Sequence, residues 1–129
     1  MKLIISSLAV AASLAFSIIA NPAPVQKEVT IAVNDIYVPG GTTSNSEAYV
    51  IVSGMFPNSC YKWARADITS QTPFIHEVRV VANVAQTMCM MVLIPFQHEV
   101  VFGRLASGSH TLRFVSGDGT YIEKTLRVD

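Results

Sequence analysis

Apolar and polar residues alternate with a period of two along most of the chain beyond residue 27. In the run 28–33, Val29, Ile31 and Val33 fall on one side of an extended backbone. This pattern predicts half-buried β-strands. Asn34 and Asp35 interrupt the first run, which then continues through 36–38. Further β-prone runs occupy 48–54, 60–68, 73–81, 98–103, 110–115 and 120–128.

The last two runs are separated by Ser116–Gly119, which contains the sequence Gly-Asp-Gly. Two alternating runs around such a turn predict a β-hairpin. Helical periodicity is absent beyond the first 20 residues, and turn signals recur every 8–12 residues or so. The sequence therefore predicts an antiparallel β-sandwich, in preference to a closed barrel.

The segment 88–94 departs from the alternating pattern because it is apolar on both faces. We expect it to be a central strand that is buried on both sides. It contains Cys89, and the only other cysteine is Cys60. A Cys60–Cys89 disulfide would close a loop of about 30 residues and stabilise the fold by roughly 3.6 kcal/mol. Free thiols and a metal site are the alternatives.

The N-terminus predicts export. Lys2 precedes the uncharged, apolar segment Leu3–Ile19, and the small residue Ala20 is followed by the proline-rich stretch 21–24. This layout is typical of a secretory signal peptide. We expect a signal peptide at 1–20, with cleavage after residue 17 or 23 as alternatives. The competing interpretation is a membrane anchor, since about 17 apolar residues is the lower limit for a spanning helix.

Cleavage leaves a loose lead-in at 21–27 and one domain at 28–129. The product would be periplasmic or secreted, a setting in which two cysteines are typically oxidised. We expect no stable membrane insertion after cleavage. Removing residues 1–20 removes one basic residue, Lys2, so 8 basic residues face 9 acidic ones. The basic residues are scattered singly along the chain, which argues against nucleic acid as a partner and against a polybasic membrane patch.

The segment Val101–Leu112 resembles the corner between two strands of immunoglobulin-like and fibronectin-like domains. Those domains place a tyrosine at this corner, and its hydroxyl bonds to the corner backbone. His110 stands at the tyrosine position here, and its imidazole N–H could make the same bond. The resemblance implies an all-β, immunoglobulin-like antiparallel sandwich of about seven to eight strands, with one disulfide.

The chain also resembles small exported proteins of Gram-negative bacteria. The resemblance rests on Gly54–Cys60 (Gly-x-x-Pro-x-x-Cys), a second cysteine, the Pro95-Phe96 pair and the terminal hairpin. It supports the fold and the compartment and implies no particular chemistry.

Catalytic signatures are weak. Ser109 and His110 are adjacent, and adjacent residues on a strand point to opposite faces. The carboxylates lie in alternating runs, where cross-strand pairs such as Arg113 with Glu123 account for them. A small hydrolase, or an inhibitor of one, is therefore our third interpretation.

Metal binding is the second interpretation, because exported copper proteins use methionine, histidine and cysteine ligands. The candidate ligands are Met88, Met90, His76 and His98. Methionine is more often adaptable core filler, so we predict no metal and no cofactor.

The first interpretation is an exported, non-enzymatic interaction or structural module with an unknown protein partner. Loops at the ends of a sandwich commonly contact partners. The candidate contact residues are Gly40, Gly41 and Asn45 in one polar loop, and Met55 and Phe56 at an apolar turn. The alternative for Phe56 is that its ring tucks over the end of the sandwich.

Overall fold

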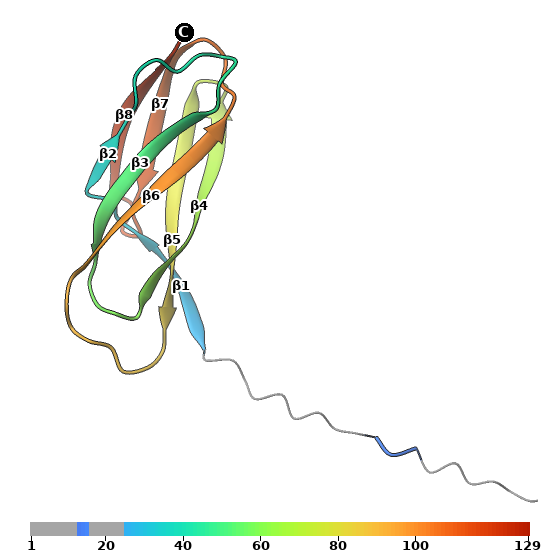
Figure 1. The fold of residues 1–129 in the computed structure, drawn as a ribbon, viewed down its shortest axis with the longest axis vertical. Coiled ribbons are helices and arrows are strands. Elements are labelled where there is room, and N and C mark those ends of the chain that lie inside the picture. The colour runs from blue at the N-terminus through green and yellow to red at the C-terminus, as the bar shows by residue number, and fades with distance from the viewer. Residues whose placement is uncertain (1–12, 16–24) are drawn as a thin grey trace, which may run out of the picture.

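A computed structural model describes residues 13–15 and 25–129. Residues 25–129 form two facing β-sheets (Figure 1), which confirms the predicted all-β sandwich. The predicted signal peptide and the first part of the lead-in lie outside the described residues, apart from 13–15. The strands are β1 Gln26–Ile31, β2 Asp35–Tyr37, β3 Ala48–Phe56, β4 Tyr61–Thr72, β5 Ile75–Ala85, β6 Ile94–Gly103, β7 Gly108–Val115 and β8 Tyr121–Val128.

The first alternating run contributes a strand to each sheet. β1 pairs with β5 in the five-stranded sheet, whereas β2 pairs with β3 in the three-stranded sheet β2-β3-β6. The chain changes sheets at 32–34, where the Asn34 amide donates to the Ser53 carbonyl oxygen at 2.8 Å. The interruption predicted at Asn34 and Asp35 is therefore the crossing between the two layers.

β5 is the centre of the larger sheet. β4 pairs with one of its edges, and β1 and β7 share the other, with Ile31 opposite Val80 and Phe114 opposite Val78. β7 runs parallel to β5, while every other strand pair in residues 25–129 is antiparallel. The parallel pair arises because the connection 104–107 crosses from one sheet to the other before β7 begins. The predicted terminal hairpin is confirmed as β7 and β8.

The sandwich has two distinct ends (Figure 1). One holds the start of β1, the turn 57–60 and the connection 86–93, because Gln26 pairs with Ala85 and Phe56 with Ile94. We call it the entry end. The opposite end holds the loop 38–47 and the C-terminus, and the Asp129 amide donates to the Thr42 carbonyl oxygen at 2.9 Å.

The core lies between the sheets and is built from the inward positions of alternating strands. Val50 and Val52 of β3, Val78 of β5, and Leu112 and Leu126 of the hairpin are fully buried. A buried leucine or valine contributes about 1.5–3 kcal/mol relative to an exposed one. These residues follow the alternation in the sequence, so the same pattern that predicted the strands also selects the core.

Aromatic rings close the entry end of this core. The Phe56 ring stacks on Phe96 with centroids 4.5 Å apart. The Tyr61 ring centroid lies 6.0 Å from that of Phe56, and the Trp63 centroid lies 6.1 Å from that of Phe96. Gly54 leaves room for this cluster, because a Cβ atom there would lie 2.5 Å from Cζ of Phe96.

We therefore expect Gly54→Ala to destabilise the protein by about 1–3 kcal/mol, since the added methyl group would force the stacked Phe96 ring to shift. Gly40→Ala is the matched control, because a Cβ there meets no atom within 4 Å. Urea unfolding of both variants makes the comparison. Equal stability of the two variants would show that the aromatic cluster is loosely packed.

Candidate functional site

The most exposed apolar segment of the described chain is the connection between β5 and β6, residues 86–93, which we call the methionine loop. Met88 is 98% exposed, Met91 81% and Leu93 67%, and Met90 and Val92 are also exposed. The prediction of a doubly buried strand at 88–94 is therefore wrong. β5 already fills the centre of its sheet, and the chain must then cross to the other sheet at the entry end.

The methionine loop is held in place despite its exposure. Cys89 is bonded to Cys60, with the two Cα atoms 5.4 Å apart, as the sequence predicted. The Met90 amide donates to Ser59 Oγ at 2.7 Å, and the Met90 carbonyl oxygen accepts from the Ser59 amide at 3.0 Å. The Gln86 amide donates to the Val25 carbonyl oxygen at 3.1 Å. The loop is thus fixed to the turn before β4 and to the start of β1.

This arrangement can present apolar surface without letting it fold inward. No residue from Gln86 to Gln97 carries a charge. Contiguous exposed apolar surface on a folded domain marks contact sites for other molecules. Methionine side chains are flexible and adapt to irregular partners.

The predicted contact residues do not form one surface. Gly40, Gly41 and Asn45 are exposed at the C-terminal end, whereas Met55 is exposed near the entry end. Phe56 is only 5% exposed and belongs to the aromatic cluster, so its side chain is not available to a partner. The alternative expectation, a ring tucked over the end of the sandwich, is the one observed.

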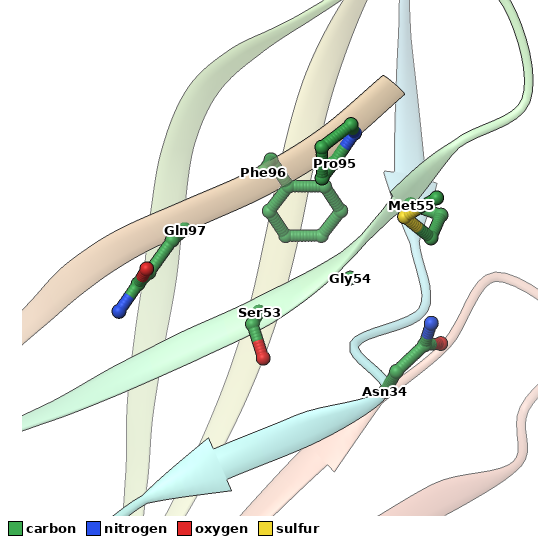
Figure 2. A pocket seen from close by; sticks show the side chains of 7 residues that line it. All are labelled: Asn34, Ser53, Gly54, Met55, Pro95, Phe96 and Gln97. Atoms are coloured by element: carbon green, nitrogen blue, oxygen red, sulfur yellow. The ribbon is translucent and has the colours of Figure 1, made fainter. Parts of the chain in front are cut away.

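A groove of about 510 Å³ lies on the three-stranded sheet beside the crossing at Asn34 (Figure 2). Ser53 and Met55 of β3 and Pro95 and Gln97 of β6 line it, with Gly54 and Phe96 between them. The lining side chains are neutral, so the groove can offer hydrogen bonds and apolar contact. Sequence reasoning missed the groove, because it depends on the pairing of β3 with β6.

A buried histidine pair connects β5 to β7 near the other end. His76 Nε2 lies 2.9 Å from His110 Nδ1, and His110 Nε2 lies 2.6 Å from the Ala106 carbonyl oxygen. His110 thus bonds to the corner backbone, as expected for the residue at the tyrosine position. Ser70 Oγ lies 2.7 Å from His76 Nδ1.

The direction of these bonds follows from the carbonyl, which can only accept. His110 donates from Nε2, its Nδ1 accepts from His76 Nε2, and His76 Nδ1 accepts from the Ser70 hydroxyl. With Nδ1 accepting and Nε2 donating, the His76 imidazole is uncharged. A serine beside an imidazole is the beginning of a nucleophilic site, but no carboxylate of residues 25–129 hydrogen-bonds to this group. Ser109, which the sequence placed beside His110, is exposed and not part of it.

The four candidate metal ligands are spread along the molecule. His76 is near the start of β5 and the methionine loop follows its end, which separates them by roughly 30 Å at about 3.3 Å per residue. His98 stacks on Trp63 at 4.2 Å. The described residues contain no group of three or more His, Cys, Asp or Glu side chains placed to hold a metal ion.

Burial, and the charge that His110 can carry beside it, lower the pKa of His76 below its ordinary value. Below about pH 6.5, His76 therefore binds a proton more readily in the unfolded chain than in the folded protein. We expect stability to fall with pH below this point, by at most about 1.4 kcal/mol per pH unit from this residue.

Chemical unfolding between pH 5 and 7 measures this dependence. His76→Gln should flatten the pH dependence, whereas His98→Gln, which replaces an exposed histidine, should leave it unchanged. If wild type and His76→Gln lose stability in parallel, His76 does not resist protonation in the folded protein.

A family model described as "ORF11 beta-sandwich domain" matches residues 50–128, which span β3 to β8 almost completely. No curated protein and no solved structure matches the chain. Within the described residues, no helix is long and apolar enough to span a bilayer.

Proposed function

The chain belongs to the ORF11 beta-sandwich domain family, and on that premise we propose that it is an exported, non-enzymatic interaction module that uses the methionine loop as its contact surface. One observation carries the proposal. Five apolar side chains of one loop are exposed, and a disulfide and three hydrogen bonds, two of them between backbone groups, hold that loop against the domain.

The apolar side chains of the methionine loop could in principle be buried in the domain itself. Burying Met88, Met91 and Leu93 in the domain's own core would be favourable by about 1.5–3 kcal/mol each. The bond to Cys60 keeps the loop at the edge of the sandwich, where its side chains are left to another molecule. A loop fixed before binding also loses little conformational entropy on association.

Export is supported by two features. Leu3–Ile19 is an uncharged apolar segment behind Lys2, as in a signal peptide. The Cys60–Cys89 bond is compatible with an oxidising compartment such as the periplasm or the cell exterior.

The non-enzymatic part of the proposal rests on the position of the reactive side chains. Ser70 is exposed on β4, an edge strand, and its histidine partner is buried beneath it. The groove lies on the other sheet and is lined by Asn, Ser, Gln, Met and Pro side chains with no acid or base among them. The arrangement therefore does not bring a nucleophile to a concave surface.

Site-specific photo-cross-linking in the native host tests the proposed contact surface. A benzophenone amino acid at Met90 should give a covalent adduct, whereas the same amino acid at Tyr37 should not. Tyr37 is the matched control, because it is 62% exposed on β2. Mass spectrometry of the adduct identifies the bound molecule. No adduct from position 90, or the same adduct from both positions, would refute the assignment of the loop.

A further inference from the structure

We infer that the methionine loop docks on the surface of a lipid bilayer that contains anionic lipids. This inference rests on the proposed function, because it names the partner of the same loop. The sequence alone favoured a protein partner. The position of the loop and the charges around it favour lipid.

The loop lies where the chain enters the domain. The Gln86 amide bonds to the Val25 carbonyl oxygen, and β1 begins one residue later. The steps from Ala20 to Val25 can span at most about 18 Å. Whenever Leu3–Ile19 is inserted in a membrane, before cleavage or as an anchor, the entry end is therefore held close to the bilayer.

The charges behind the loop are complementary to anionic headgroups. Lys27 of β1 lies opposite Val84, and Lys62 of β4 opposite Asn83, at the end of β5 that leads into the loop. Neither lysine forms an ion pair with a carboxylate of the described residues. The nearest acid on β1, Glu28, is neutralised by Arg65 through hydrogen bonds of 2.7 and 2.9 Å.

The composition of the loop fits an interfacial contact. The loop has apolar side chains at its tip and no charge between Gln86 and Gln97, and the lysines are set back from the tip. A surface that enters the headgroup region of a bilayer has this arrangement. Basic residues near such a surface strengthen binding roughly five-fold each, on the scale measured for anionic membranes. A protein partner would have to present an apolar pocket with an acidic rim, whereas an anionic bilayer offers both features on any part of its surface.

Depth-dependent fluorescence quenching on the full chain tests the inference. The probes are Met91→Trp, and Asn45→Trp at the opposite end as the control. Vesicles contain phosphatidylethanolamine and phosphatidylglycerol with brominated acyl chains. Vesicles should shift the emission of the Met91→Trp variant to the blue and quench it more than that of the wild type, whose only tryptophan is Trp63. The Asn45→Trp variant should show no blue shift and no more quenching than the wild type.

Vesicle flotation of chains without introduced tryptophan supplies the second readout. Lys27→Gln and Lys62→Gln should each weaken binding about five-fold, and Met91→Asp by about ten-fold or more. Exchanging phosphatidylglycerol for phosphatidylcholine should weaken binding of the wild type most and of each lysine variant less, because each variant retains one of the two lysines.

The two proposals fail in distinguishable ways. If the indole introduced by Met91→Trp is not quenched but position 90 cross-links to a protein in the host, the loop is a contact surface and the lipid inference is wrong. If that indole is not quenched and position 90 gives no adduct, both are wrong. Binding that is insensitive to Met91→Asp would assign membrane affinity to the N-terminal segment alone and overturn the inference.

Discussion

The bond between Cys60 and Cys89 decides where the most apolar connection of this chain lies. It joins the turn before β4 to the loop after β5, at the end of the sandwich where the chain enters. Closing a loop of about 30 residues stabilises a domain by roughly 3.6 kcal/mol in the chain-entropy picture, which is a large share of a typical net stability of about 5–15 kcal/mol. The same bond keeps methionine side chains outside the core. The disulfide thus both stabilises the domain and keeps the methionine loop exposed.

The two ends of the sandwich are closed by different chemistry. At the entry end, Phe56 stacks on Phe96, and Trp63 packs against Phe96 at a tilt, so aromatic rings close the core there. Toward the other end, His76 and His110 bridge β5, β7 and the corner at Ala106. The first closure is built from aromatic rings, while the second includes His76, whose pKa is lowered by burial. The proposed contact surface lies at the end of the sandwich away from this histidine pair.

Local patterns in the sequence were sufficient for the strands, the terminal hairpin and the disulfide, because each depends on residues near in sequence or on cysteine count. The loop at 88–93 was misassigned because apolar composition indicates that a segment avoids water, and not which molecule covers it. The histidine pair was missed for another reason. His76 and His110 meet only through the parallel pairing of β5 with β7, and Ser70 joins them through the register of β4. The groove beside Asn34 likewise depends on strand pairing.

The central claim is that the methionine loop is exposed and held at the entry end in the folded, oxidised protein. Oxidation by dilute hydrogen peroxide, followed residue by residue with mass spectrometry, tests it directly, because thioether oxidation depends on solvent access. With the disulfide intact, Met88, Met90 and Met91 should oxidise nearly as fast as they do in the urea-unfolded chain. Strong protection of these three residues in the folded protein would place them in a buried strand and contradict the account.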